Sequence, residues 1–340
     1  MTDGSSALLT DRRGRALRDL RVSVTDRCNF RCGYCMPREH FPHGHVFLPR
    51  EQLLRFEEIA RFVRVASSVG VRKVRLTGGE PLLRAELPRL VALLSSLPDV
   101  EVALTTNGSL LARHAAALAD AGLRRITVSL DALEPQVFRT MSDSEVQVEH
   151  VLEGIEAARR AGLAPLKVNA VIRRGMNDHQ IVPLAAYFKG SGISIRFIEY
   201  MDVGITNGWR LDQVVSGAEM VARIDAVFPL QVVPTESEGE VARRYRYLDG
   251  SGEVGVITSV SKPFCDGCSR LRLSSDGQLY TCLFATQGHD LRALMRGSAE
   301  DAAVHGFLRE LWERREDRYS ELRTGRTRQL PRVEMSYIGG

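Results

Sequence analysis

The chain contains very little lysine and no long apolar run. Only four of its 46 Lys and Arg residues are lysine, and 42 Asp and Glu residues are interspersed among them. No segment approaches the ~20 consecutive apolar residues that a membrane span needs. Residues 1–21 also lack the apolar core of a secretory signal. We therefore expect a cytoplasmic protein with no membrane partner. The absence of a block of like charge argues against nucleic-acid binding as well.

Cysteine is also scarce, and its six residues fall into two groups of three. Six cysteines in a small secreted protein would suggest three disulfides, but a reducing cytosol disfavours them. The short spacings within each group indicate metal binding instead. The two groups are Cys28, Cys32 and Cys35, and Cys265, Cys268 and Cys282.

Short apolar segments alternate with helical patterns through the first two-thirds of the chain. Glycines such as Gly122 and Gly162 follow helical patterns and precede strands, as helix C-caps do. About six β-then-α units result, which indicates parallel strands with helices packed outside. Periodicity alone leaves open an open doubly wound sheet, a barrel or a partial barrel. The expected strands are 21–25, 71–77, 100–105, 125–130, 166–171 and 193–199, and the expected helices are 51–69, 86–96, 110–121, 146–161 and 179–188.

The pattern changes after about residue 203. A helical segment over 217–227 leads into short strand-like runs, and the sequence Ser-Asp-Gly-Gln at 275–278 predicts a hairpin turn. Two further helices are expected near 290–295 and 299–318. The last third therefore departs from the βα repeat. Its strand-like runs are 230–233, 243–248, 253–259, 271–274 and 279–281.

The first cysteine group directly follows the first expected strand, with the spacing Cys28-x3-Cys32-x2-Cys35. Three closely spaced thiolates can ligate three irons of a cubane cluster and leave one iron open. An open iron can bind S-adenosylmethionine for reductive cleavage to a radical. The alternative metal, zinc, usually takes four ligands in two Cys-x2-Cys pairs, which fits this spacing poorly. The triplet resembles the signature of the radical S-adenosylmethionine superfamily.

Other strand ends extend this resemblance. Thr77-Gly78-Gly79-Glu80-Pro81 resembles the methionine-binding Gly-Gly-Glu motif of the superfamily, and glycines there let a backbone approach a ligand closely. Polar residues at the carboxyl ends of parallel strands line the active site in barrels. The resemblance therefore implies that S-adenosylmethionine is contacted by Tyr34, Gly79, Ser129 and Met201.

The second cysteine group, Cys265-x2-Cys268-x13-Cys282, again offers three thiolates. Its spacing alone is compatible with a second cluster, or with zinc and a fourth ligand such as His289. The surrounding segment, Lys262-Pro-Phe-Cys-Asp-Gly-Cys-Ser-Arg-Leu-Arg272, resembles the second-cluster segment of the GTP 3′,8-cyclase family of molybdenum-cofactor biosynthesis. This similarity runs from residue 19 to the end. It implies two [4Fe–4S] clusters, the second of which binds the purine of GTP.

The same resemblance implies the fold and its divisions. The fold class is α/β: a partial (βα)6 TIM-like barrel of the radical SAM type, with a C-terminal α+β extension that closes the barrel side. The barrel core is expected over residues 19–205, and the segment with the second cluster and the Gly-Gly tail over 206–340. Residues 1–18 have no counterpart in the family and are expected to be flexible.

The expected substrate and tail residues also follow from the resemblance. Several basic residues would offset the roughly four negative charges of a triphosphate, which one arginine could not. The Gly-Gly tail is expected to insert toward the active site and to be needed for activity, because only glycine threads past ligands without side-chain clashes. The substrate residues are Arg21, Arg75, Thr106, Lys167, Arg270 and Arg272, with Lys73 and Arg196 as further candidates, and the catalytic tail is Gly339 and Gly340.

The implied function is conversion of GTP to (8S)-3′,8-cyclo-7,8-dihydroguanosine 5′-triphosphate, by removal of the ribose 3′ hydrogen and attack on guanine C8. Expected partners are an electron donor such as flavodoxin or ferredoxin, cyclic pyranopterin monophosphate synthase as recipient of the product, and a second copy of the chain in a homodimer. One alternative is another two-cluster radical enzyme, such as a peptide-modifying maturase. A zinc-stabilised nucleic-acid-binding protein is the other, and the interspersed acidic residues disfavour it.

Overall fold

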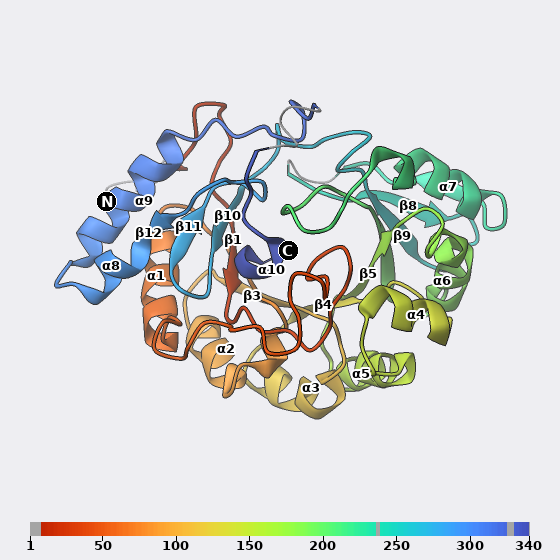
Figure 1. The fold of residues 1–340 in the computed structure, drawn as a ribbon, viewed down its shortest axis with the longest axis horizontal. Coiled ribbons are helices and arrows are strands. Elements are labelled where there is room, and N and C mark those ends of the chain that lie inside the picture. The colour runs from red at the N-terminus through yellow and green to blue at the C-terminus, as the bar shows by residue number, and fades with distance from the viewer. Residues whose placement is uncertain (1–7, 236–238, 325–329, 340) are drawn as a thin grey trace.

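The computed structural model describes residues 8–235, 239–324 and 330–339. Its core is a run of βα units in which parallel strands are followed by helices on the outside (Figure 1). The core strands are β1 (Asp19–Ser23), β2 (Lys73–Thr77), β3 (Glu101–Thr106), β4 (Arg125–Ser129), β5 (Leu166–Ile172) and β6 (Ser194–Glu199). The core helices are α1 (Phe56–Ser68), α2 (Leu87–Ser95), α3 (Leu111–Asp120), α4 (Pro135–Ser142), α5 (Val148–Arg160) and α6 (Ile181–Phe188).

The last third of the chain adds strands to both edges of this sheet. β10 pairs in parallel with β1, β9 pairs in parallel with β6, and antiparallel strands continue outward on each side. The sheet curves without closing, so the predicted partial barrel is confirmed (Figure 1). These elements are α7 (Gly217–Asp225), β7 (Leu230–Val232), β8 (Arg243–Tyr247), β9 (Glu253–Ile257), β10 (Arg270–Leu273), β11 (Gln278–Tyr280), β12 (His289–Asp290), α8 (Leu291–Arg296), α9 (Asp301–Glu313) and α10 (Met335–Ile338).

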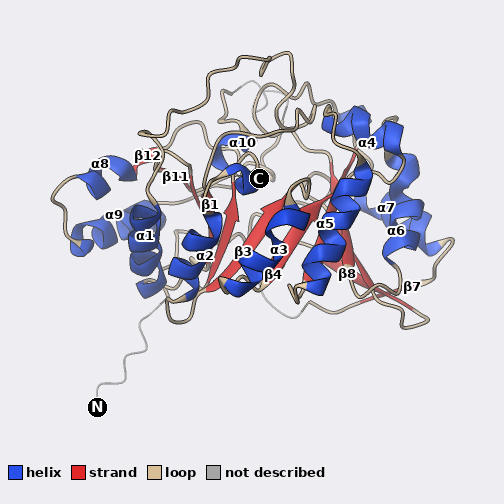
Figure 2. Cartoon of the chain, turned by 90° about the horizontal axis from the view of Figure 1, so that it is seen from below, coloured by secondary structure: helices blue, strands red, loops and turns tan. Residues whose placement is uncertain are grey.

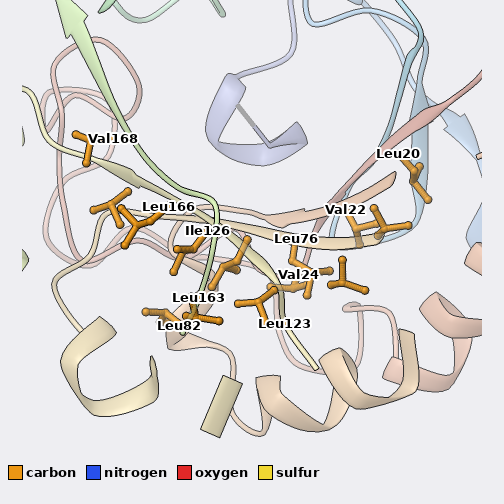
Figure 3. Packing of buried hydrophobic residues seen from close by; sticks show 14 of the residues in the cluster. Leu20, Val22, Val24, Leu76, Leu82, Leu123, Ile126, Leu163, Leu166 and Val168 are labelled. Atoms are coloured by element: carbon orange, nitrogen blue, oxygen red, sulfur yellow. The ribbon is translucent and has the colours of Figure 1, made fainter. Parts of the chain in front are cut away.

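Side chains alternate along the core strands between an apolar outer face and a polar inner face. On the outer face, Leu20 and Val22 of β1 are fully buried and lie in register with Val74 and Leu76 of β2. Figure 3 shows such residues between the sheet and its helices, with α10 on the opposite face. Figure 2 shows α2, α3 and α5 covering the outer face. Because only this face is apolar, the inner face can carry charge.

Helix α1 starts later than the sequence pattern predicts. Its apolar residues Phe56, Ile59 and Phe62 follow the spacing of an amphipathic helix and are buried. The carboxylate of Glu58 accepts the backbone N–H of Arg55 at 2.7 Å, which fixes the helix start at residue 56. The five residues before it, which we predicted to be helical, are turn and loop instead.

The other expected core elements are present, with ends shifted by a few residues. The sequence pattern missed α4, a short helix with Pro135 in its first turn. It also missed the two-residue strand β12 and the four-residue helix α10. Elements this short carry too few residues to display a helical or strand period.

The N-terminal segment is packed, contrary to our expectation of flexibility. Over residues 8–18, Leu9 and Leu17 are buried, and the Leu17 N–H donates to the Leu9 carbonyl at 2.9 Å. The indole N–H of Trp312 in α9 donates to the Arg15 carbonyl at 3.1 Å. The segment is therefore anchored against the C-terminal helices; the residues before it lie outside the described ranges.

After α9 the chain returns across the mouth of the barrel. Arg61 of α1 holds the start of α9 through an ion pair with Asp301, at 2.7 Å. The chain then runs to α10, which lies in the middle of the curved sheet (Figure 1).

Within the described ranges, none of the helices has the length and apolar composition needed to cross a bilayer.

Replacing a fully buried outer-face side chain should strongly reduce stability. Phe197 of β6 has no exposed surface, so Phe197→Ala should lower the free energy of unfolding by about 3–5 kcal/mol. Val232 on the edge strand β7 is 48% exposed, and Val232→Ala should change it by less than about 0.5 kcal/mol. Urea unfolding followed by circular dichroism checks both values; equal losses would contradict this account of the core.

Candidate functional site

The first cysteine group lies in the loop that follows β1, at the carboxyl edge of the parallel strands. All three cysteines are free of disulfides and partly buried. The backbone N–H groups of Cys35 and Met36 both donate to the Cys32 carbonyl at 2.9 Å, and the Phe30 N–H points at the Cys28 Sγ from 3.4 Å. The loop therefore turns tightly around its three thiols.

The Gly-Gly turn after β2 packs directly against this loop. The Gly79 N–H donates to the Thr25 carbonyl at 2.8 Å, and the Glu80 N–H donates to the Arg27 carbonyl at 2.7 Å. A Cβ at Gly79 would lie 2.2 Å from the Arg27 carbonyl oxygen, and one at Gly78 would lie 2.5 Å from that of Thr25. We expected these glycines to admit a ligand. The structure shows that the absence of side chains at both positions allows the backbone of the cysteine loop to pack closely against this turn.

The structure places Thr106 away from the inner face. Its hydroxyl donates to the Glu80 Oε1 at 2.7 Å and accepts the Gly108 N–H at 3.0 Å, and burial raises the pKa of Glu80 to about 7. Its neighbour Thr105 faces inward instead, where it accepts a hydrogen bond from Arg75 at 3.0 Å. The predicted contact between Thr106 and substrate therefore stays a prediction, while Thr105 is an additional candidate.

The residues predicted to contact S-adenosylmethionine come from separate strand ends on the same edge. The Tyr34 hydroxyl donates to Asp131 Oδ2 at 2.8 Å, which joins the cysteine loop to the end of β4. Ser129 of β4 is in register with Asn169 of β5. The Asn169 Oδ1 is buried and has no hydrogen-bond partner among the described residues. Such an orphaned acceptor beside Ser129 suits a ligand that donates hydrogen bonds.

The second cysteine group lies at the opposite end of the strands. Cys268 precedes β10, whose first residue, Arg270, is in register with Asp19 at the start of β1. Cys28 follows the far end of β1. β1 is about five residues or ~16 Å long. The two cysteine groups thus flank the inner face of β1 and β10.

Two arginines point at the sulfur of Cys268. Arg270 and Arg315 each donate to its Sγ, at 3.3 and 3.2 Å. Burial alone would raise the pKa of Cys268, but the positive charges of these arginines outweigh it and lower the pKa to about 6. The Phe284 N–H points at the Cys282 Sγ from 3.4 Å. The environment therefore favours the thiolate of Cys268, whereas burial raises the pKa of Cys282 to about 12.

A row of three arginines crosses the inner face between the two cysteine groups. Arg21 of β1 is in register with Arg272 of β10 on one side and with Arg75 of β2 on the other. Burial, together with the charges of Arg272, Arg270 and Arg75, holds the pKa of Arg21 well below its usual value. Like charges opposite each other destabilise a sheet. Within the described ranges, none of these three arginines forms an ion pair with a carboxylate, so the row would be stabilised by a bound anion.

Lys167 of β5 belongs to a second set of inner cations. Burial, reinforced by Arg196 and Arg125, lowers the pKa of Lys167 to about 7. Burial also lowers the pKa of Arg196 to about 10. Arg125 is compensated by an ion pair with Glu101 at 2.8 Å. Of the predicted substrate residues, the inner face thus gathers Arg21, Arg75, Lys167, Arg270 and Arg272, but not Thr106.

The C-terminal tail reaches the same inner face. Ile338 is fully buried, and the Gly339 carbonyl accepts a hydrogen bond from Arg272. Gly339 has a φ of +76°, and a Cβ there would lie 2.3 Å from the Thr77 Cγ2, so only glycine fits. Gly340, the other predicted tail residue, lies outside the described residues.

Asp202 holds the returning chain in place, a role that sequence reasoning missed. It is 2% exposed and accepts hydrogen bonds from Tyr319 at 2.8 Å, Arg323 at 2.9 Å and Arg332 at 3.1 Å. Asp202 follows Met201, a predicted cofactor residue at the end of β6. One carboxylate thus ties the loop after β6 to the C-terminal segment. The Glu-Tyr-Met-Asp sequence indicated the end of a strand. The hydrogen-bond partners of Asp202 could not be predicted, because they lie more than a hundred residues away in sequence.

The donor sets fit iron–sulfur clusters. Burial raises the pKa of Cys28 to about 12 and that of Cys35 further, so these thiols become thiolates only beside added positive charge such as iron. Within the described chain, no three His, Cys, Asp or Glu side chains converge on a single-ion site. Each thiolate of a cluster binds a different iron, so cluster ligands need not converge on one point.

Comparison with known proteins identifies the family. Two protein-family models match the chain: Radical SAM superfamily over residues 22–188 and Molybdenum Cofactor Synthesis C over residues 193–321. A GTP 3′,8-cyclase of Acidothermus cellulolyticus is 54% identical, over 98% of this chain and 99% of its own length. The chain belongs to the GTP 3′,8-cyclase family. Relatives of the same name from Xanthomonas axonopodis pv. citri and Staphylococcus carnosus are 53% and 48% identical, covering 98% of this chain and 100% and 99% of their own lengths.

Solved structures share the fold. The crystal structure of Streptococcus suis SuiB bound to S-adenosylmethionine has a TM-score of 0.59 and 14% identity, covering 93% of this chain and 73% of SuiB. SuiB bound to its precursor peptide SuiA has a TM-score of 0.56 and 15% identity, covering 87% of this chain and 68% of SuiB. At this identity the likeness concerns the fold alone. The family match assigns an iron–sulfur cluster and S-adenosylmethionine as cofactors.

The contact between the Gly-Gly turn and the cysteine loop predicts a selective loss of iron. In Gly79→Ala the new Cβ collides with the Arg27 carbonyl, which displaces the loop and its three ligands. Gly33 lies within the same loop, and a Cβ added there would meet no other atom within 4 Å, so Gly33→Ala is the matched control. After anaerobic reconstitution, Gly79→Ala should bind about four fewer irons per chain than Gly33→Ala. Equal iron contents would refute this role of Gly79.

Proposed function

We propose that this chain cyclises GTP to (8S)-3′,8-cyclo-7,8-dihydroguanosine 5′-triphosphate, the first step of molybdenum-cofactor biosynthesis. The row Arg272–Arg21–Arg75 carries the proposal. Among the described residues, no carboxylate forms an ion pair with these three side chains, and a bound polyanion would compensate them. A triphosphate brings roughly four negative charges. The curated relatives named GTP 3′,8-cyclase indicate guanosine as its nucleoside.

Each cysteine group has the donor set for one [4Fe–4S] cluster. The first would be held by Cys28, Cys32 and Cys35, with S-adenosylmethionine beside Tyr34, Gly79, Ser129, Asn169 and Met201. When bound, cluster and S-adenosylmethionine together supply a 5′-deoxyadenosyl radical that takes the ribose 3′ hydrogen. The second cluster would be held by Cys265, Cys268 and Cys282.

The inner cations have the task of fixing the nucleotide between the two cysteine groups. The arginine row spans β10, β1 and β2, and Lys167 and Arg196 reach in from β5 and β6. Guanidinium groups hold phosphate oxygens bidentately and so restrict rotation of the triphosphate. A nucleotide fixed in this way keeps its ribose in one orientation relative to the first cysteine group, which is what hydrogen transfer requires.

The C-terminal segment has the task of excluding water and stray hydrogen donors. Asp202 anchors Tyr319, Arg323 and Arg332, which closes the segment over the barrel mouth. Gly339 then reaches the inner face beside Arg272. A closed site protects a reactive carbon radical during formation of the bond to guanine C8.

The reaction also defines the partners. The product is an isomer of GTP, because the 3′ hydrogen leaves to 5′-deoxyadenosine and one hydrogen is regained at the guanine ring. One electron cleaves S-adenosylmethionine, and a second, with a proton, completes the product. We therefore propose a low-potential donor such as flavodoxin or ferredoxin, and cyclic pyranopterin monophosphate synthase as recipient of the product. By resemblance to the family, the chain would act as a homodimer.

Anaerobic turnover tests the proposed function. Reconstituted protein given S-adenosylmethionine, dithionite and GTP should form 5′-deoxyadenosine and the cyclised nucleotide in equal amounts. ATP in place of GTP should give little of either product, and Arg21→Ala should reduce GTP turnover at least tenfold because its charge holds the substrate. A peptide-dependent reaction with none from GTP would contradict the proposal.

The low pKa of Lys167 predicts pH-dependent substrate binding. With a pKa of about 7, its amine is largely neutral at pH 8.5 and about half charged at pH 7. A triphosphate stabilises the charged form, so GTP should bind several-fold more tightly at pH 7 than at pH 8.5, with proton uptake. Calorimetry in buffers of different ionisation enthalpy measures both effects. Lys167→Arg stays charged and should flatten the dependence; an equally steep dependence in this variant would contradict the assignment.

A further inference from the structure

A buried charge network links the two ends of the chain beside the second cysteine group. The side chains of Asp11, Arg15 and Arg315 are 0%, 2% and 1% exposed. The Asp11 Oδ2 accepts hydrogen bonds from the Arg15 Nε at 2.6 Å and from the Arg315 Nη1 at 3.0 Å. Asp11 lies in the N-terminal segment, and Arg315 follows α9. These segments are separated by about three hundred residues of sequence, so the contact joins the N-terminal segment to the segment that follows α9.

Other donors of both arginines contact the cysteine segments. Arg15 Nη1 donates to the Cys265 carbonyl at 2.9 Å. Arg315 donates from Nη1 to the Cys268 carbonyl at 2.7 Å, and from Nη2 to the Cys268 Sγ at 3.2 Å. Its Nε donates at 3.0 Å to the carbonyl of Thr281, the residue before Cys282. The network therefore touches the backbone at or beside all three cysteines.

Together with the neighbouring Arg270, this network has more guanidinium groups than carboxylates. Asp11 offsets one guanidinium group, and Arg315 has only the more exposed Asp317, at 3.4 Å, as a further carboxylate partner among the described residues. Arg270 adds a partly buried cation at the Cys268 Sγ. An excess of buried positive charge is costly unless an anion lies beside it. Three thiolates bound to a cluster supply that anion, and hydrogen bonds to cluster sulfurs favour the more negative, reduced state.

We propose that Asp11, Arg15 and Arg315 are the positioning residues of the second cluster. They hold the segments of Cys265, Cys268 and Cys282 in ligating positions, and the Arg315 contact to sulfur raises the reduction potential of the cluster. The N-terminal segment is thus part of the cluster site. The inference rests on the second cluster of the proposed function and assigns its support to residues outside both cysteine groups.

The chain offers a matched control for these residues. Arg12 and Glu316 lie one position from Asp11 and Arg315 and join the same two segments through an ion pair at 2.6 Å. Their side chains are 59% and 63% exposed, and exposed ion pairs contribute little to stability. Arg12→Gln therefore removes a link between the two segments without touching the buried network.

The test compares Arg315→Gln, Arg315→Lys, Asp11→Asn and Arg12→Gln in the full chain after anaerobic reconstitution. Wild type and Arg12→Gln should bind about eight irons per chain. Arg315→Gln and Asp11→Asn should keep about four, with the electron paramagnetic resonance signal of the first cluster and S-adenosylmethionine cleavage intact. Retention of the first cluster shows that these variants are folded.

The potential of the second cluster is measured with Cys28, Cys32 and Cys35 replaced by serine, so that only the second cluster gives a signal. Arg315→Lys keeps a charge but loses donors, and its midpoint potential should be lower than that of Arg12→Gln. Eight irons in Arg315→Gln, or an unchanged potential in Arg315→Lys, would overturn the proposal. Wild type with only about four irons would instead contradict the second cluster itself, and the inference with it.

Discussion

The rest of the structure depends on a concentration of positive charge on the inner face of the sheet, which has no carboxylate ion-pair partner in the part of the chain that the structure describes. Arg21, Arg75 and Arg272 lie side by side across three parallel strands, and helices cover only the opposite, apolar face. Like charges placed opposite each other destabilise a sheet, and a negative group on its concave side offsets this cost. In the proposed function, cluster-bound thiolates near the two ends of β1 supply part of that charge, and a nucleotide triphosphate supplies the rest. The stability of the sheet is therefore expected to increase when these negatively charged groups are bound.

Segments near both ends of the chain contact the site on the inner face. The N-terminal segment reaches the second cysteine group through Arg15, and the C-terminal segment reaches the inner face through Gly339. Each is anchored by one buried carboxylate, Asp11 for the first and Asp202 for the second. Because these carboxylates bind arginines from distant parts of the chain, the site forms only in the complete fold. The C-terminal segment places α10 inside the open, curved sheet (Figure 1).

Sequence reasoning recovered what local spacing encodes. The cysteine groups and the βα repeat were visible because period and spacing are local properties. The inner arginines were assigned by resemblance to the family. The buried network at Asp11 was not visible, because an Asp and an Arg four residues apart usually lie on a solvated surface. Asn169 was not predicted as a ligand-binding residue, although it lies two positions after Lys167 on the same face of β5. Thr106 was assigned to the substrate by resemblance, whereas its neighbour Thr105 is the residue that faces inward. Partners distant in sequence leave no local signal.

We propose that the charged interior holds the ribose of GTP where the first cysteine group can act on it. The most direct measurement is the fate of the 3′ hydrogen. Reconstituted protein given S-adenosylmethionine, dithionite and GTP deuterated at C3′ should yield 5′-deoxyadenosine that carries one deuterium, together with a cyclised nucleotide that has lost it. Mass spectrometry distinguishes the outcomes. Unlabelled 5′-deoxyadenosine formed alongside deuterated nucleotide would contradict the account.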